Sequence, residues 1–290
     1  MNIEPKQCLL CGRPAPLQAS HIIPKFVFDW LKETSATGFL RRAVAPNVRV
    51  QDGEKRKLLC RDCEAKFARW EKRFAEHLFV PYQKDRKAAL RYEKWLLLFS
   101  VSVAWRIGVS KVSVDEKVRP ELLKALEDAI QCWTLFLLGT HTEAGPYEHH
   151  LFLLDVVTAS GAVDLPQGFN RYLLRTVDCT VVSSSKKLFV YAKFPNMIFR
   201  SSVVPPQAPG WVNTRIEEKG EIRGPQQVSE PSFAEFLVDR AKLVTGSVGE
   251  MSARQRKVIG SAALRNPARA LQSLTRRAAV ADERLRRRRV

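Results

Sequence analysis

The sequence predicts an α+β fold with a small cysteine-rich N-terminal module, a helical and antiparallel β domain, and a basic helical tail. Three observations favour this fold. Cysteine pairs stand near the N-terminus, helical periodicity gives way to strand alternation near residue 149, and basic residues crowd the last forty positions. A chain of 290 residues can bury a large core and suggests about two domains. We therefore expect boundaries at 1–81, 82–250 and 251–290.

The cysteine pairs Cys8-x-x-Cys11 and Cys60-x-x-Cys63 have the same spacing and account for four of the six cysteines. Four thiolates in two such pairs are the usual ligand set of a closed, tetrahedral structural zinc site. Such a site leaves no coordination position for a substrate, so any chemistry must come from other side chains. Six cysteines are too few for a disulfide scaffold in a chain of this length, which indicates a reducing compartment.

A helix is expected over 63–79, "CEAKFARWEKRFAEHLF", with Pro81 ending it. Its apolar residues recur at helical spacing: Phe67, Trp70, Phe74 and Leu78. Glu64 shares the face of Phe67, so its carboxylate should point toward the interior of the module. A buried acid needs a partner, and a divalent cation, a histidine or an arginine would serve.

The middle region is expected to contain two helices over 82–140, the second opening at Pro120. From about 149 to 222 alternation predicts strands at 151–157, 176–182, 187–194 and 196–204, and a hairpin over 211–222 that turns near Lys219 and Gly220. His149 and His150 should face opposite sides as a surface pair. This region could bind a protein partner or sense a ligand.

The C-terminal region is expected to be helical. Ser232 and Glu235 form a capping box for a helix that Gly246 can close. Farther on, Asn266 caps and Pro267 opens a helix. Its apolar stripe is thin and consists of Leu271, Leu274, Ala278 and Leu285. The final segment, 284–290, is too charged to pack and should be solvated.

The net charge of +18 lies mainly at the two ends of the chain. Residues 1–81 carry 15 basic and 9 acidic side chains, residues 82–250 carry 21 and 19, and residues 251–290 carry 12 and 2. Such clusters attract polyanions, so DNA is the expected partner and RNA the alternative, although a merely solubilising tail would look the same. The candidate contacts are Lys55, Arg56, Lys57, Arg61, Arg276 and Arg277.

No membrane segment is expected. The longest apolar run, Trp95 to Trp105, has eleven residues, whereas a helix needs about 20 to cross a bilayer. The N-terminus "MNIEPKQC" lacks the apolar stretch of a secretory signal. These features predict a cytoplasmic protein. The sequence also contains no Walker-type loop, Gly-x-Gly-x-x-Gly loop or serine-nucleophile motif that would indicate another enzyme class.

The segment "QASHIIPKF", residues 18–26, contains the main catalytic candidate, His21. An imidazole titrates near neutral pH and can take a proton from water, and Pro24 should place His21 near the end of a strand. The Cys-x-x-Cys pair, the His-Ile-Ile-Pro string and "LLCRDCE" opening a helix resemble the HNH endonucleases, whose ββα-metal finger is often stapled by a four-cysteine zinc site. The resemblance covers about residues 8–75, a quarter of the chain.

The resemblance implies a role for three residues. His21 would be the general base, while Ser20 before it and Glu64 after the last cysteine would bind a catalytic Mg²⁺ or Mn²⁺. The sequence departs from the family pattern at two positions. Ser20 is a weak metal ligand, and the asparagine typical of the family would fall on Lys55, with Asn47 too early in the chain. Glu64 would therefore carry most of the metal binding.

Two functions follow from these features. The first is an endonuclease that hydrolyses phosphodiester bonds in DNA, with His21 activating water and a divalent ion at Glu64. The second is a non-catalytic adaptor in which zinc shapes a basic surface that binds nucleic acid. An enzyme needs His21 beside a divalent ion, whereas an adaptor does not.

Overall fold

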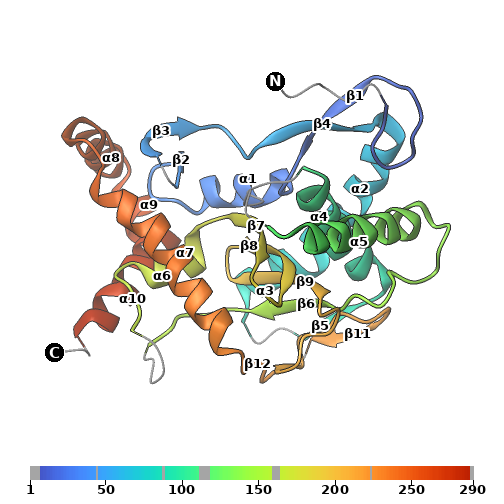
Figure 1. Ribbon diagram of the computed structural model, residues 1–290. Helices are drawn as coiled ribbons and strands as arrows, with labels where there is room; N and C mark the ends of the chain where they lie inside the picture. The colour runs from blue at the N-terminus through green and yellow to red at the C-terminus, as the bar shows by residue number, and fades with distance from the viewer. Residues whose placement is uncertain are drawn as a thin grey trace.

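The computed structural model describes residues 7–43, 45–86, 89–110, 118–158, 164–222 and 224–287. It combines helices with small antiparallel sheets, which confirms the predicted mixture (Figure 1). The strands are β1 (Leu17–His21), β2 (Leu40–Arg42), β3 (Ala45–Val50), β4 (Lys55–Cys60), β5 (Leu90–Tyr92), β6 (His149–Leu153), β7 (Asp178–Ser183), β8 (Leu188–Phe194), β9 (Met197–Val204), β10 (Trp211–Val212), β11 (Gly220–Ile222) and β12 (Gln227–Val228).

Helices pack on both faces of the largest sheet (Figure 1). The helices are α1 (Lys25–Glu33), α2 (Arg61–Phe74), the π-helical turn η1 (Ala75–Phe79), α3 (Val80–Lys84), α4 (Lys94–Val109), α5 (Pro120–Leu138), α6 (Phe169–Arg175), α7 (Pro231–Gly249), α8 (Ala253–Arg265), α9 (Pro267–Gln272) and α10 (Leu274–Arg287). Helix α8 lies apart from this sheet, beside β2 and β3 (Figure 1).

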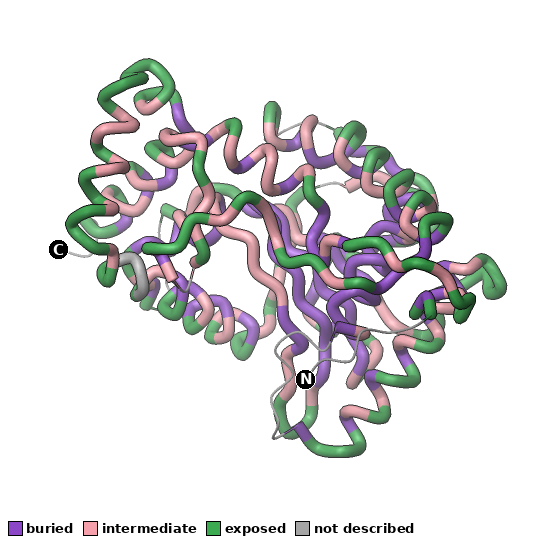
Figure 2. Tube along the Cα trace, turned by 90° about the horizontal axis from the view of Figure 1, so that it is seen from above, coloured by how far each residue is buried: buried purple, intermediate pink, exposed green. Residues whose placement is uncertain are grey.

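The largest sheet has four antiparallel strands in the order β6-β9-β8-β7. All seven residues of β8 are buried, and they alternate between two apolar clusters. Val190 packs into the first cluster and Tyr191 into the second, because successive side chains of a strand point to opposite faces. Both faces of the sheet are therefore covered, and the buried chain lies at the centre of the molecule (Figure 2).

Helix α4 lies between this sheet and the N-terminal module. Thirteen of its sixteen residues are buried, so it packs on all sides rather than along one stripe. Its Phe99 stacks on Phe74 of α2 with ring centroids 4.0 Å apart, and it also contacts Phe194 and Phe199 of the sheet. One continuous apolar cluster consequently joins α2, α4 and the sheet.

The second face of the sheet is covered by α6, α7 and α10. Asp282 of α10 accepts hydrogen bonds from the backbone N–H groups of Asn170 and Arg171, at 2.7 and 3.1 Å, in the first turn of α6. A carboxylate satisfies otherwise unpaired donors there and complements the helix dipole. The C-terminal helices are thus docked on the body of the protein.

The helix expected to end at Pro81 instead continues to Lys84. The backbone N–H of Val80 bonds to the carbonyl of Ala75, five residues back, which is the spacing of the π-helical turn η1. Proline has no N–H and its ring crowds the carbonyl four residues earlier, so the wider turn just before Pro81 accommodates it. The expected boundary at residue 81 therefore falls inside α3.

The hairpin expected over 211–222 does not form. β10 pairs with β12, and β11 pairs with the distant strand β5 instead of with β10. The alternating sequence predicted that these residues form strands, but β10 and β11 each pair with a strand outside the expected hairpin. The strands expected at 176–182, 187–194 and 196–204 and both helices of 82–140 are confirmed, whereas the strand expected at 151–157 is displaced and forms at His149–Leu153.

The expected boundaries of the late helices need correction. α7 begins at Pro231, so Ser232 lies inside its first turn, and the helix passes Gly246 to end at Gly249. Ser273 separates α9 from α10, because its hydroxyl accepts from the backbone N–H of Arg276 at 3.2 Å. Asn266 caps α9 as expected. Leu271 is exposed.

Two further expectations are wrong. His149 and His150 are buried instead of superficial, although they do face opposite sides, toward Trp133 and Trp211. Leu285 packs in the second cluster, so the segment 284–290 is not solvated throughout; its last three residues lie outside the described part of the chain. None of the described helices combines the length and apolarity needed to cross a membrane.

Lys193 of β8 is expected to make the stability depend on pH. Its ammonium group is fully buried and donates to the carbonyl of Thr176 at 2.8 Å, and burial lowers its pKa to about 7. Between pH 7 and the ordinary lysine value the unfolded chain holds one more proton than the native one, so stability should rise with pH in this window. Relative to Lys193→Met, the free energy of unfolding should increase by about 1 kcal/mol per pH unit from pH 7.5 to 9.5.

Urea unfolding of both proteins at several pH values measures this difference, in which the effects of other groups cancel. A difference that stays constant over the window would contradict the prediction.

Candidate metal centre and its surroundings

The first cysteine pair sits in a tight turn. The N–H of Gly12 bonds to the carbonyl of Cys8 at 2.8 Å, and Gly12 has a φ of +70°, which glycine adopts without strain. The N–H of Leu9 bonds to the carbonyl of Leu58 at 2.9 Å and ties this turn to β4. The sequence therefore brings Cys8 and Cys11 beside the end of β4.

The second pair lies where β4 becomes α2. Cys60 is the last residue of β4 and precedes the first residue of the helix, and Cys63 lies in the first helical turn. β1 pairs antiparallel with β4, so residues 17–21 are fixed beside the same helix. Two strands and the helix thus carry the second pair, Ser20 and Glu64.

The four sulfur atoms form a compact cluster. They lie within 4.8 Å of one another, with Cys11 and Cys60 3.8 Å apart. Ligands about 2.3 Å from a tetrahedral zinc ion are separated by about 3.8 Å, whereas a disulfide is about 2.0 Å long. The cluster therefore matches a metal site better than a disulfide, and the four cysteines could hold a metal ion such as zinc.

The surroundings of the thiols differ. Burial raises the pKa of Cys8 and Cys63, so these groups need a cation nearby to be thiolates at neutral pH. Burial also acts on Cys11, but hydrogen bonds, chiefly from Arg13, outweigh it and lower the pKa of Cys11 to about 6. A divalent ion at the centre would favour the thiolate form of all four.

Arg13 lies beside the sulfur cluster. Its guanidinium group is 3.5 Å from the sulfur of Cys11 and 4.0 Å from that of Cys60, and it pairs with Asp62 at 2.9 Å. Four thiolates around one divalent ion leave a net charge of −2, which the arginine partly offsets. Arg13 and Asp62 also border a cavity of about 300 Å³ next to Cys60.

Ser20 and Glu64 are in direct contact, although 44 residues separate them. The buried hydroxyl of Ser20 donates to the Glu64 carboxylate at 2.5 Å. These are two of the three residues that the resemblance assigns to a catalytic site. Because the contact joins β1 to α2, the predicted side chains do come together.

The next residue, His21, is paired with a carboxylate. Its Nε2 lies 3.1 Å from Asp52, which also binds Lys55 at 2.8 Å. Both His21 and Asp52 are mostly buried, with 16% and 19% of their side chains exposed. The backbone carbonyl of His21 accepts from Arg106 of α4 at 2.9 Å, so the residue is held from two sides.

Asp52, Arg13 and Arg106 were not identified from the sequence. Asp52 belongs to the segment "QDGEK" before β4, and an acidic residue in a Gly-containing loop is an ordinary turn signal. The pairing of β1 with β4 brings it to His21. If β1 and β4 are taken as an antiparallel pair, the residues just before β4 lie opposite the end of β1, and this alone would have placed Asp52 near His21.

The fit of this region to a catalytic divalent ion is incomplete. Among the described residues, the sulfur cluster is the only group of three or more His, Cys, Asp or Glu ligands close enough to share an ion. The oxygen atoms of Ser20 and Glu64 lie 2.5 Å apart. Two neighbouring oxygen ligands of Mg²⁺, each 2.0–2.1 Å from the ion, lie about 2.9 Å apart. The pair would have to separate slightly, with water or phosphate oxygens completing the shell.

The candidate nucleic-acid contacts fall in two places. Lys55 is paired with Asp52, Arg56 bonds to Glu54 and to the carbonyl of Ser110, and Arg61 is exposed on the first turn of α2. Lys57 is exposed on β4.

Arg276 and Arg277 lie on α10, at the opposite side of the molecule from β1 and β4 (Figure 1). Arg277 lies 3.7 Å from Asp155. The two groups therefore do not form one contiguous patch.

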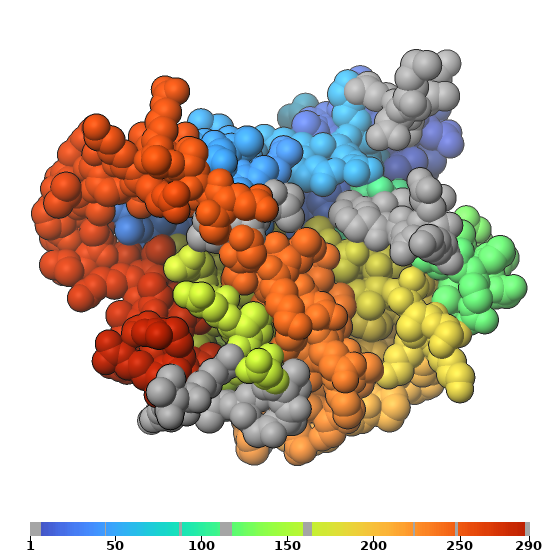
Figure 3. Space-filling view, turned by 60° about the vertical axis from the view of Figure 1, so that its left-hand side comes forward, coloured from blue at the N-terminus to red at the C-terminus, as the bar shows by residue number. Residues whose placement is uncertain are grey.

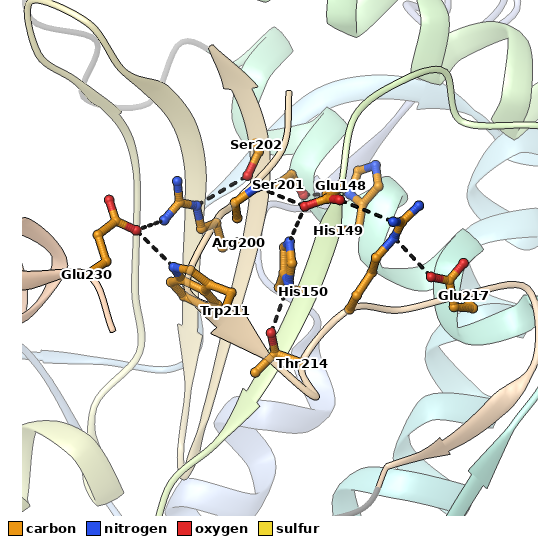
Figure 4. Close-up of polar contacts among 12 residues, drawn as sticks. Glu148, His149, His150, Arg200, Ser201, Ser202, Trp211, Thr214, Glu217 and Glu230 are labelled. Atoms are coloured by element: carbon orange, nitrogen blue, oxygen red, sulfur yellow. Dashed lines mark hydrogen bonds and ion pairs between the residues drawn. The ribbon is translucent and has the colours of Figure 1, made fainter. Parts of the chain in front are cut away.

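A second polar cluster surrounds His150 at the edge of the sheet (Figure 4). It borders a cavity of about 390 Å³ that is lined by Glu148, His150, Trp211 and Arg215, among others. The Glu148 carboxylate already accepts from His150, Arg215 and the backbone of Ala208, at 3.2, 3.1 and 2.8 Å. Burial lowers the pKa of His150 to about 4 despite Glu148, so the ring is neutral at pH 7. These contacts hold the neighbouring loops against the sheet.

Comparison with protein-family models, with curated proteins and with solved structures finds no match to this chain.

Proposed function

We propose that residues 8–75 form an HNH-like endonuclease module, stapled by zinc, that hydrolyses phosphodiester bonds in DNA. The observation that supports it best is a pair of polar contacts made by two adjacent residues at the end of β1. Ser20 binds Glu64, which follows Cys63 of the four-cysteine cluster, at 2.5 Å, and the adjacent His21 binds Asp52 at 3.1 Å. The strand pair followed by a helix also agrees with the ββα arrangement that the resemblance implies.

Zinc has a structural role in this proposal. The four thiolates would close its coordination shell and tie the first turn of the chain to the start of α2, so the ion would stabilise the module without binding substrate. Arg13 would stabilise the negatively charged centre through its contacts with Cys11 and Cys60.

His21 would act as the general base. A carboxylate accepts hydrogen bonds, so Asp52 favours the tautomer of His21 with the proton on Nε2. The other ring nitrogen, Nδ1, then carries the lone pair that can take a proton from an attacking water molecule. Asp52 would stabilise the imidazolium that forms. A divalent ion bound through Glu64 would supply charge stabilisation at the phosphate.

The adaptor is the second candidate, and a specific observation favours it. Ser20 and Glu64 satisfy each other, and no third His, Asp or Glu ligand joins them among the described residues. A Ser20–Glu64 contact could simply fasten β1 to α2, leaving a basic, zinc-stapled surface that binds DNA without cleaving it.

The first prediction of this proposed function concerns zinc. Purified protein should contain about one zinc ion per chain, and Cys60→Ser should lose it and destabilise the module, because structural zinc contributes directly to the free energy of folding. Cys132→Ser is the matched control, since Cys132 lies on α5 outside the cluster. Elemental analysis and thermal unfolding measure both effects. Well-folded wild-type protein without metal would contradict the site.

The second prediction concerns catalysis. His21→Ala should reduce plasmid cleavage in Mg²⁺ or Mn²⁺ about 10²-fold or more, the usual contribution of a general base, while DNA binding and zinc content stay unchanged. Asp52→Asn should reduce cleavage about tenfold or more, because the amide can also donate to the ring and favour the wrong tautomer. If His21→Ala cleaves as well as wild type, the nuclease proposal fails.

The third prediction separates the enzyme from the adaptor. Glu64→Gln should abolish the response of cleavage to Mg²⁺ or Mn²⁺, whereas Ser20→Ala should weaken it less, because a serine hydroxyl is the poorer ligand. Wild-type protein that binds duplex DNA but cleaves no nucleic acid with any divalent metal would favour the adaptor.

A further inference from the structure

Two stretches of the chain contain basic residues and no acidic ones. Residues 34–51 hold three arginines and residues 251–281 hold seven arginines or lysines, and neither contains an aspartate or a glutamate. The first stretch includes β2 and β3, and the second includes α8 and α9. They are separated by about two hundred residues of sequence.

The structure joins these stretches. Arg41 donates to Gln255 at 2.8 Å, and Asn47 accepts from the backbone N–H of Ser252 at 2.9 Å. Arg269 donates to the carbonyls of Lys32 and Ser35 at the end of α1, at 2.7 and 3.0 Å. α8 therefore lies beside the β2-β3 ribbon, as Figures 1 and 3 both show.

The shared surface, which we call the ribbon–α8 surface, presents cations to solvent. Five of its basic residues are exposed: Arg42, Arg49, Arg254, Arg256 and Lys257. Arg41, which joins the ribbon to α8 through Gln255, has a lowered pKa, through burial first and through repulsion by Arg49 second. Arg49 also covers the ring of exposed Phe39, at 4.1 Å from its centroid.

We propose that the ribbon–α8 surface binds the phosphate backbone of duplex DNA, independently of sequence. Positive charge on two joined segments that carry no acidic residue of their own attracts a polyanion, and each phosphate that it neutralises releases counterions. The surface is built by two segments distant in sequence, and it differs from the contacts expected on β4, α2 and α10.

The surface also borders the candidate catalytic pair. Arg49 and Asp52 are three residues apart, so their Cα atoms lie within about 11 Å of each other even in a fully extended chain. Asp52 in turn binds His21. A duplex held on the ribbon–α8 surface would therefore come close to His21; this part of the inference rests on the proposed function.

An anionic membrane is a poorer match to this surface. A helix that lies on a membrane needs a continuous exposed apolar face. Among the larger apolar residues of α8, Val258 and Ile259 are partly buried and only Leu264 is exposed. The exposed part of α8 is mainly basic.

The test uses the full chain with Arg254→Gln, Arg256→Gln and Lys257→Gln combined. All three side chains are exposed, so the fold should be retained. Affinity for a short duplex, measured by fluorescence anisotropy at several salt concentrations, should fall about tenfold or more at 0.1 M salt, with a salt slope shallower by up to about 2.7. A second variant, Arg42→Gln with Arg49→Gln, should show the same kind of loss.

The matched control removes three exposed lysines elsewhere: Lys124→Gln, Lys186→Gln and Lys219→Gln. It lowers the net charge equally, so a loss as large as that of the α8 variant would overturn the proposal. Wild-type affinity in the α8 variant, or no duplex binding by wild-type protein at low salt, would also overturn it. So would loss of binding to phosphatidylserine vesicles with duplex binding intact.

Cleavage assays keep the two proposals apart. If wild-type protein binds duplex through this surface but never cleaves it, the nuclease proposal fails and the surface stands. If cleavage depends on His21 while the α8 variant binds and cleaves like wild type, the nuclease stands and the surface fails.

Discussion

Burial of α4 is the constraint on which the rest of the structure depends. This helix has few polar side chains, and almost all of its surface is removed from water. Neither the sheet nor the N-terminal module alone could cover it, so both must pack against it. Phe99 stacks on Phe74 and so fixes α2 against α4, and α2 carries Cys63 and Glu64.

Arg106 adds a polar connection to the same helix. It is buried, pairs with Glu71 of α2 at 2.6 Å and donates to the carbonyl of His21. An arginine loses much hydration on burial, so such partners are needed. The position of the candidate base therefore depends on the apolar core as well as on the pairing of β1 with β4.

Local pattern predicted the elements but not their long-range contacts. Helical periodicity predicted α2, α4 and α5, because this signal depends on near neighbours. The sulfur cluster is the exception: it joins residues 49 positions apart, and the matching Cys-x-x-Cys pairs predicted it because four thiolates are a known zinc ligand set. The partner of β11, the role of Asp52 and the position of α8 beside β2 and β3 depend on residues tens to hundreds of positions away. Burial of His149 and His150 likewise required knowing that two tryptophans lie against them.

The position of α10 sets an order of events during synthesis. β1, β4 and α2, with all four clustered cysteines, are complete once residue 74 has emerged, so a metal ion could bind while the rest of the chain is still being made. The face of the sheet that carries Tyr191 is covered in part by Ala278 and Leu285. The part of that face that α6 and α7 do not cover stays open until α10 leaves the ribosome, so its apolar residues are exposed to chaperones and aggregation until then.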